Sequence, residues 1–226
     1  MGELPGTCPA APNPTPQRQC ARLAHVAPSS QPDLFGTVAP SLPDGMRYET
    51  DFLSTDEEAG LLQLIEALPL APMQYQGYTA LRRVVSYGGK YDFSKQRLDA
   101  AEPIPGWLDP LRARVAHWLG IAPTAFTQAL LAEYRPGTPL GWHRDVPDFE
   151  DVVGISLLAD ATMRFRPYPP RENRREGVLK LAIAPRSIYL LRGPARWEWQ
   201  HSVSPTKALR YSITLRTPSA LKRSRG

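Results

Sequence analysis

The second half of the chain is a succession of short segments in which apolar and polar residues alternate. Alternation with a period of two is typical of β-strands that are buried on one face. Eight short strands at this spacing favour a double-sheet jelly roll, also called a double-stranded β-helix. The strands are predicted over residues 127–134, 139–145, 152–159, 162–167, 177–183, 187–192, 199–204 and 209–217.

Two amphipathic helices are predicted before these strands. Ser54 caps the first helix, acidic side chains follow in its first turn, and Pro69 ends it. The second helix runs from Pro105 to Leu119 with an apolar stripe. Helices that precede the barrel would brace one of its sheets. The predicted fold class is therefore α+β, a jelly-roll barrel braced by N-terminal helices.

The composition divides the chain into an arm, one domain and a tail. The length of 226 residues allows a single domain with a sizeable core. Nine of the 25 prolines fall within residues 1–44, and we expect this arm to be disordered or loosely docked. The alternative is that the arm binds a partner. The domain is expected over 45–218, and a basic tail over 219–226.

Cysteine usage and hydropathy bear on the compartment. Cys8 and Cys20 both lie in the arm, so the domain is not a disulfide scaffold. A zinc site made of these two cysteines and His25 is disfavoured by their loose spacing. No apolar stretch approaches the length of a membrane span, and no signal pattern begins the chain. A protein of the reducing cytoplasm that does not enter the membrane fits best.

The net charge of +5 is concentrated in two places. The tail is basic, and residues 163–180 carry six basic side chains against two acidic ones. Patches of this kind commonly contact phosphate backbones. The alternative is a solvated loop that keeps the protein soluble. The basic residues of the 163–180 segment are Arg164, Arg166, Arg171, Arg174, Arg175 and Lys180.

Three residues have the types and spacing of an iron site. His143 and Asp145 are two apart on a predicted strand, so their side chains would share one face. A distant second histidine, His201, completes a 2-His-1-carboxylate set, which binds Fe(II) and leaves open positions for chemistry. Taken singly, each histidine has the alternative of an ordinary hydrogen-bonded side chain.

The last predicted strand carries two arginines on one face. In the sequence RYSITLR, Arg210, Ser212, Thr214 and Arg216 alternate with apolar residues. Two arginines that point into a barrel are costly unless an anion meets them. A bound dicarboxylate would supply that anion. The alternative is an edge strand whose arginines are solvated.

Four segments resemble the AlkB family of Fe(II)- and 2-oxoglutarate-dependent dioxygenases. They are AEYRPGTPLGWHRD (132–145), GPARWEWQHSVSP (193–205), RYSITLR (210–216), and a stretch from Leu81 to Ser94 that is similar to the family's nucleotide-recognition lid. The resemblance runs from about Met46 to about Pro218. It implies a jelly roll over about 126–218, a lid over about 75–100, and removal of alkyl groups from nucleic-acid bases.

The resemblance also implies roles for individual residues. His143, Asp145 and His201 would hold Fe(II), and 2-oxoglutarate and O2 would fill the open positions. Arg210, helped by the Tyr134 hydroxyl, would pair with the far carboxylate of 2-oxoglutarate. Arg216 would lie near its iron-side carboxylate.

The substrate implied by the resemblance is a base that is single-stranded or flipped out of its stack. Phe93, Tyr91 and Tyr87 would stack on that base, with packing of the lid as the alternative. Arg83 would touch a phosphate or brace the lid, and Trp142 would line the pocket.

Two departures from the family pattern bear on the substrate. Ala132 stands where the family often has Asn, and Pro147 stands where nucleobase demethylases often have an acidic residue. The leading hypothesis is a monomeric oxidative demethylase of 1-methyladenine or 3-methylcytosine in the repair of alkylated DNA or RNA. One alternative is an oxygenase of the same superfamily that acts on a protein or small molecule. The other is a noncatalytic nucleic-acid-binding module.

Overall fold

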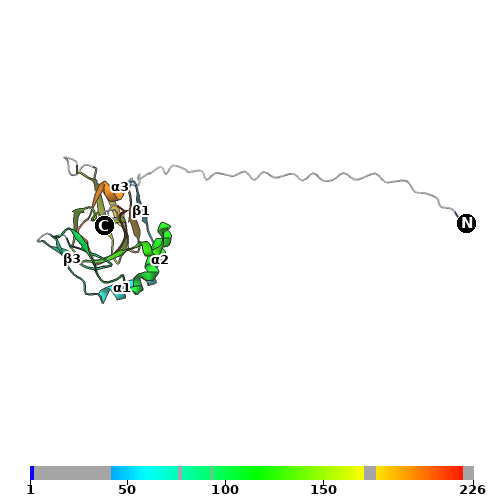
Figure 1. Cartoon of the computed structure of the whole chain (residues 1–226), viewed down its shortest axis with the longest axis horizontal. Coiled ribbons are helices and arrows are strands. Elements are labelled where there is room, and N and C mark those ends of the chain that lie inside the picture. The colour runs from blue at the N-terminus through cyan, green and yellow to red at the C-terminus, as the bar shows by residue number, and fades with distance from the viewer. Residues whose placement is uncertain (3–41, 76–77, 93, 171–176, 221–226) are drawn as a thin grey trace. The chain divides into compact units, whose positions relative to one another are not determined.

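The computed structural model describes residues 1–2, 42–75, 78–92, 94–170 and 177–220 (Figure 1). Contacts divide the chain into residues 1–37 and 38–226, and every helix and strand considered below belongs to the second unit. Expectations for most of the arm (including Cys8, Cys20 and His25), for Phe93, for 171–176 and for 221–226 lie outside the described residues.

Two antiparallel sheets form the barrel. The larger sheet contains β1 (Met46–Glu49), β2 (Ala71–Tyr75), β3 (Tyr78–Tyr87), β6 (Gln128–Tyr134), β8 (Phe149–Leu157), β11 (Ile188–Leu191) and β13 (Arg210–Pro218), in the order β1-β11-β8-β13-β6-β3-β2. The smaller sheet contains β7 (Leu140–His143), β9 (Ala161–Pro167), β10 (Leu179–Ile183) and β12 (Trp199–Val203), in the order β10-β9-β12-β7. The eight predicted strands are β6 to β13, and their division between two sheets confirms the double-stranded β-helix.

Three strands that precede the jelly roll extend the larger sheet. β1 pairs with β11, and β3 pairs with β6 from Arg83↔Glu133 to Tyr87↔Ala129. Most of the segment from Leu81 to Gly88 therefore lies in a strand of the larger sheet, and the lid over about 75–100 stays a prediction. The β-branched and aromatic residues of this segment favour a pleated, half-buried surface. A separate two-stranded sheet, β4 (Lys90–Asp92) with β5 (Arg97–Asp99), follows.

The predicted helices cover one face of the larger sheet. α1 spans Thr55–Glu66, and α2 spans Asp109–Leu119 after a 3-10 turn at Gly106–Leu108. Ser54 Oγ accepts from the Glu57 amide while the Glu57 carboxylate accepts from the Ser54 amide, so the predicted cap is present. Both helices lie on the same side of the barrel in Figure 1, with Ile65 and Val115 in the main core. Within the described residues, no helix is both long and apolar enough to span a membrane.

The alternation along β13 separates the core from the site. Tyr211, Ile213 and Leu215 pack towards the helices in the main core. The intervening residues face the barrel interior, which also holds a second apolar cluster that includes Phe165 and Tyr189. The sequence prediction that Arg210, Ser212, Thr214 and Arg216 share one face is confirmed by this division. The larger sheet thus packs on helices with one face and presents polar groups to the interior with the other.

The Tyr189 ring of β11 packs directly over Gly154 of β8, inside the barrel. The two residues are register partners, and a Cβ at position 154 would overlap the Tyr189 ring. A glycine within a strand often marks such a close approach. Burial of the phenol raises the pKa of Tyr189 to about 12.

We expect Gly154→Ala to destabilise the fold by about 1–3 kcal/mol, because the ring and strand must move apart. Denaturant unfolding would measure the change. The matched control is Gly60→Ala in α1, where a Cβ meets open space and should stabilise the helix by about 0.5–1 kcal/mol. Equal stability of the Gly154 variant and the wild type would contradict this packing.

Candidate metal and cosubstrate site

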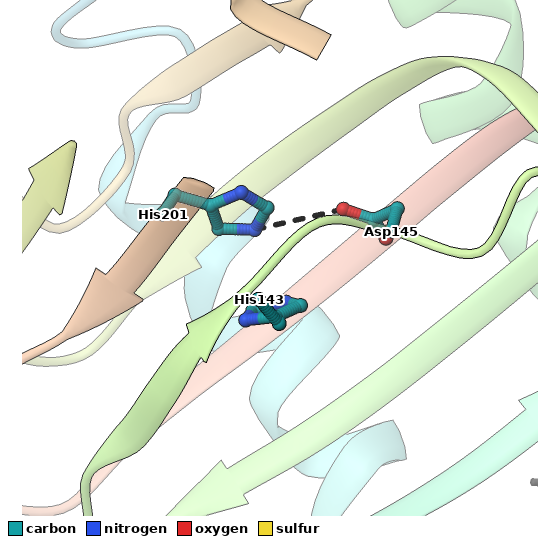
Figure 2. A group of neighbouring side chains, drawn as sticks. All are labelled: His143, Asp145 and His201. Atoms are coloured by element: carbon teal, nitrogen blue, oxygen red, sulfur yellow. Dashed lines mark ion pairs between the residues drawn. The ribbon is translucent and has the colours of Figure 1, made fainter. Parts of the chain in front are cut away.

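Three side chains from the smaller sheet and the loop after it converge (Figure 2). His143 is the last residue of β7, and it is the register partner of His201 in β12. Their ring centroids are 4.2 Å apart. Asp145 Oδ2 lies 3.5 Å from His201 Nε2, and one ligand atom from each of the three residues lies within 4.8 Å of the others. The smaller sheet therefore brings together two histidines that are distant in sequence.

The protonation states of these groups fit a cation. Burial lowers the pKa of His143 and lowers that of His201 to about 3, so both imidazoles keep a lone pair at neutral pH. Burial alone would raise the pKa of Asp145, but the Arg216 guanidinium and the two histidines hold it well below its usual range. His143 Nδ1 lies 2.9 Å from the Gly141 carbonyl, to which it donates as the Nδ1–H tautomer, leaving Nε2 as the available ligand atom.

Asp145 does not belong to a strand, which corrects the sequence prediction. β7 ends at His143, and the two residues after it have left the smaller sheet. Arg216 of β13 holds the carboxylate instead: its Nε and Nη2 donate to Oδ1 at 2.9 and 2.6 Å. Among the described residues, the buried Oδ2 has no hydrogen-bond donor. One oxygen is thus fixed by an arginine and the other is left for a metal ion.

Arg216 is itself positioned by a short polar chain on the interior face. Its Nη1 donates to Gln128 Oε1 at 2.7 Å, and Gln128 Nε2 donates to Ser86 Oγ at 2.9 Å. This chain joins β13, β6 and β3 to the carboxylate. Arg216 was expected near the iron-side carboxylate of 2-oxoglutarate, and that role stays a prediction beside the contact with Asp145.

The short helix α3 (Pro194–Trp197), just before β12, holds the loop that carries Asp145. Arg196 is only 2% exposed, and its Nη2 donates to the carbonyls of Val146 and Phe149 at 2.7 and 2.9 Å. Arg144 donates from Nη1 to the Trp197 carbonyl at 2.8 Å. Hydrogen bonds from Arg196 and Arg144 therefore join α3, which precedes His201, to the loop that follows His143.

Arg210 is a buried arginine with a donor left over, and its predicted role is to bind the far carboxylate of 2-oxoglutarate. It is 1% exposed, its Nε donates to Ser156 Oγ at 2.9 Å, and its guanidinium carbon lies 4.9 Å from the centroid of the Tyr134 ring. Among the described residues, its buried Nη1 has no acceptor. A buried guanidinium with a donor left over is costly, and a carboxylate would satisfy it.

Tyr134 adds a phenol hydroxyl to the barrel interior near Arg210. Burial of the phenol would raise its pKa, but the positive charges of Arg82 and Arg210 lower it. A phenol between two guanidinium groups is a good hydrogen-bond donor to an anion. Tyr134 and Arg210, which are register partners on β6 and β13, are thus brought together as predicted from the sequence.

Two of the residues predicted to contact substrate, Arg83 and Tyr87, have other contacts in the fold. Arg83 donates to the Glu133 carboxylate at 3.2 Å and to the Leu70 carbonyl at 2.7 Å, which favours the bracing alternative. Tyr87 packs against the main core, away from the interior. Tyr91 is partly buried in β4, and Phe93 lies outside the described residues.

Trp142 does not lie on the ligand face of its strand, contrary to the pocket-lining prediction. Adjacent residues of a strand point to opposite sides, so Trp142 faces outwards where His143 faces inwards. Its ring contacts the guanidinium groups of Arg164 and Arg166, at 5.0 and 4.5 Å from the centroid. The sequence position of Trp142 beside His143 was misleading, because successive side chains of a strand point to opposite faces of the sheet.

Two arginines near the site were missed in the sequence. Arg82 lies on the interior face of β3, and its charge lowers the pKa of both Tyr134 and His143. The signal was available: Arg83, Val85 and Tyr87 form one alternating set, which leaves Arg82 on the opposite face. Arg196 had no such signal, because its contacts depend on tertiary structure alone.

A family model described as the 2OG-Fe(II) oxygenase superfamily matches residues 45–217. The tRNA (carboxymethyluridine(34)-5-O)-methyltransferase alkbh8 of Xenopus tropicalis is 28% identical over 75% of this chain and 27% of its own length. The probable RNA/DNA demethylase ALKBH6 of Danio rerio is 24% identical over 70% of this chain and 69% of its own. The solved structure of OsALKBH1 superposes with a TM-score of 0.62 at 15% identity, covering 78% of this chain and 98% of that one.

The fold, the His-Asp-His cluster and the family match agree. The chain belongs to the 2OG-Fe(II) oxygenase superfamily, and it is an Fe(II)- and 2-oxoglutarate-dependent dioxygenase. The two relatives and the solved structure named above are AlkB homologues by name, which confirms the resemblance seen in the sequence. The chain spans 27% of the length of the Xenopus ALKBH8 protein and 50% of that of an ALKBH8 homolog of Arabidopsis thaliana.

We expect Arg196→Met to weaken metal binding by about tenfold or more, because the loop that carries Asp145 loses its clamp. Titration of the apo protein with Mn(II), followed by electron paramagnetic resonance, would measure the affinity. The matched control is Arg192→Met, which removes a bidentate pair with Asp151 instead of a contact with the loop that carries Asp145. Equal metal affinity of the Arg196 variant and the wild type would contradict the positioning role.

Proposed function

We propose that this dioxygenase removes N-alkyl groups from nucleic-acid bases of the 1-methyladenine and 3-methylcytosine type, in the repair of alkylation damage. The observation that carries the proposal is the match of the whole catalytic region to AlkB homologues, one of which is named a probable RNA/DNA demethylase. The expected substrate is a single-stranded or flipped base. The catalytic domain is proposed to be residues 45–218, acting as a monomer in the cytoplasm.

Five polar side chains of the interior have a role in this proposal. His143, Asp145 and His201 would hold Fe(II), and Arg210 with Tyr134 would hold the far carboxylate of 2-oxoglutarate. Fe(II), 2-oxoglutarate and O2 together supply an oxidant that hydroxylates the alkyl carbon, with succinate and CO2 as coproducts. The hydroxylated carbon then leaves the base nitrogen as formaldehyde. The buried interior would exclude water from these steps.

The second candidate is an oxygenase that acts on a protein or small molecule, and one observation favours it. Pro147 is exposed where an acidic residue would meet the base. Of the acidic residues close by, Glu150 accepts from Trp197 Nε1 at 3.0 Å and is turned towards α3. A positive group, Arg82, faces the interior instead. Substrate choice is therefore where the two candidates differ.

The first experiment addresses the reaction. A single-stranded oligonucleotide with one 1-methyladenine or 3-methylcytosine would be incubated with protein, Fe(II), ascorbate and 2-oxoglutarate, then weighed by mass spectrometry. We expect a loss of the methyl mass that requires both iron and 2-oxoglutarate. His143→Ala and Asp145→Ala should abolish it while the circular dichroism spectrum is retained, because each variant removes a proposed metal ligand.

The outcomes separate the candidates. Succinate formed without loss of methyl would reject the demethylase and favour the protein or small-molecule oxygenase. Retained turnover in either variant at saturating iron would reject the ligand assignment. No succinate under any condition, with the oligonucleotide bound, would leave the noncatalytic binding module.

The second experiment addresses the cosubstrate. We expect Arg210→Met to raise the half-saturating 2-oxoglutarate concentration by about tenfold or more, because a charge-assisted bond worth about 1.5–3 kcal/mol is lost. Succinate release at varied 2-oxoglutarate would measure this. Arg192→Met, which removes an arginine remote from Tyr134, is the control. An unchanged requirement in the Arg210 variant would refute its assignment.

A further inference from the structure

The turn that leads from β3 into β4 is tied to polar side chains of the barrel. The Gly89 carbonyl accepts from Ser86 Oγ at 2.6 Å and from Gln128 Nε2 at 3.2 Å. One residue earlier, the Gly88 amide donates to the Glu102 carbonyl at 2.6 Å, which joins the two ends of the segment that contains the β4–β5 hairpin. The hairpin therefore starts from a turn whose backbone is held by side chains of β3 and β6.

Close packing also fixes this turn. Gly88 has a φ of +76°, and a Cβ there would overlap the carbonyl of Thr127, the residue just before β6. Glycine allows both this backbone conformation and this approach. At Gly89, a Cβ would press on the Leu98 side chain of β5. The start of the hairpin thus lies directly against the start of β6.

The orientation of the Gln128 amide follows from its partners. The Arg216 guanidinium can only donate, so the amide oxygen Oε1 faces its Nη1, at 2.7 Å. The Gly89 carbonyl can only accept, so the amide nitrogen Nε2 faces it. Nε2 also donates to Ser86 Oγ at 2.9 Å, since the Ser86 proton is used on Gly89. Both ends of a buried amide are thus used, one towards the metal site and one towards the hairpin.

The hydrogen bonds of Gln128 continue to a proposed metal ligand. Arg216, from which Gln128 accepts, donates to Asp145 Oδ1 at 2.9 and 2.6 Å. An unbroken chain of hydrogen bonds therefore connects the first turn of the hairpin with the carboxylate. A buried donor or acceptor that loses its partner costs free energy, so a displacement at one end of this chain disfavours the arrangement at the other.

We infer that Gln128 is a positioning residue that links the β4–β5 hairpin to the metal site, holding Arg216 with one end of its amide and the Gly89 turn with the other. Metal affinity and hairpin order then depend on each other, because coupling between two sites is reciprocal. This link does not rest on the proposed function. Its value for the substrate does rest on it, since Tyr91 of β4 is predicted to stack on the base. A hairpin ordered by the metal would offer that ring to a base when the site is loaded.

The test uses the full chain with Mn(II) in place of Fe(II). Titration followed by electron paramagnetic resonance gives the metal affinity, and hydrogen exchange over residues 90–99, read by mass spectrometry, measures hairpin order. In the wild type we expect Mn(II) to slow this exchange. Gln128→Met should weaken Mn(II) binding by about tenfold or more. It should also speed exchange over the hairpin by about fivefold or more, with no slowing by Mn(II).

Gln128→Glu separates the two ends of the amide. Its carboxylate still accepts from Arg216, but it cannot donate to the Gly89 carbonyl. We expect this variant to recover most of the Mn(II) affinity lost in Gln128→Met, while exchange over the hairpin stays fast and independent of Mn(II). It also decides the case if Gln128→Met fails to fold, because slow, Mn(II)-dependent exchange in Gln128→Glu would overturn the inference.

The matched control is Gln200→Met in β12. Gln200 is the neighbour of His201, and its Oε1 accepts from Arg166 on the opposite face of the sheet. The same side chain is therefore removed beside a proposed metal ligand, on the face that points away from it. We expect wild-type Mn(II) affinity and wild-type exchange. Equal losses in the Gln200 and Gln128 variants would mean general destabilisation and would overturn the inference, as would wild-type values in Gln128→Met.

The failure of this inference differs from the failure of the proposed function, because the test above contains no nucleic acid. The expected variant results without any demethylation would keep the link and reject the nucleobase substrate. Demethylation by a wild type whose hairpin exchange does not respond to Mn(II) would reject the link alone. A single-stranded oligonucleotide with 1-methyladenine should slow the exchange further at saturating Mn(II). No further slowing, with demethylation established, would reject the contact between the hairpin and the base.

Discussion

The pairing of Arg216 with Asp145 is the interaction on which the rest of the site depends. Asp145 follows the end of β7, so no ladder hydrogen bond fixes its position. The arginine occupies Oδ1 and keeps the carboxylate ionised despite its burial. In turn, the carboxylate gives a buried guanidinium its counter-charge. Removing either partner would leave the other as an uncompensated charge in the barrel, which is the expensive case for buried ions.

Much of the fold followed from periodicity. The eight strands and two helices were predicted because alternation and capping are local patterns, and β13 shows this most clearly: the same residues that assign its apolar face to the helices assign Arg210 and Arg216 to the interior. The pairing of His143 with His201 agrees with the ligand set proposed from spacing. The roles of these residues stay predictions.

Two kinds of position could not be predicted: residues just beyond the end of a strand, and strand residues whose side-chain direction depends on the exact register. The expected strand was extended through Asp145, but the chain turns there and a distant helix residue, Arg196, holds it. Trp142 and Arg83 were assigned to the site because of their neighbours in the sequence. A shift of one residue along a strand, however, moves a side chain to the opposite face of the sheet. Arg82, the neighbour of Arg83, is the one that faces the interior.

The buried Arg210 links the stability of the folded protein to its cosubstrate. A guanidinium enclosed with a donor unsatisfied by the described residues is a cost to the folded chain that an anion relieves. A ligand that binds only the folded state stabilises it by mass action, by about 2.7 kcal/mol at a concentration of about 100 times its Kd. The cosubstrate would then be a folding ligand as well as a reactant. In a cell depleted of it, a larger share of this protein would be unfolded and open to proteolysis, so that its abundance would follow the metabolic supply.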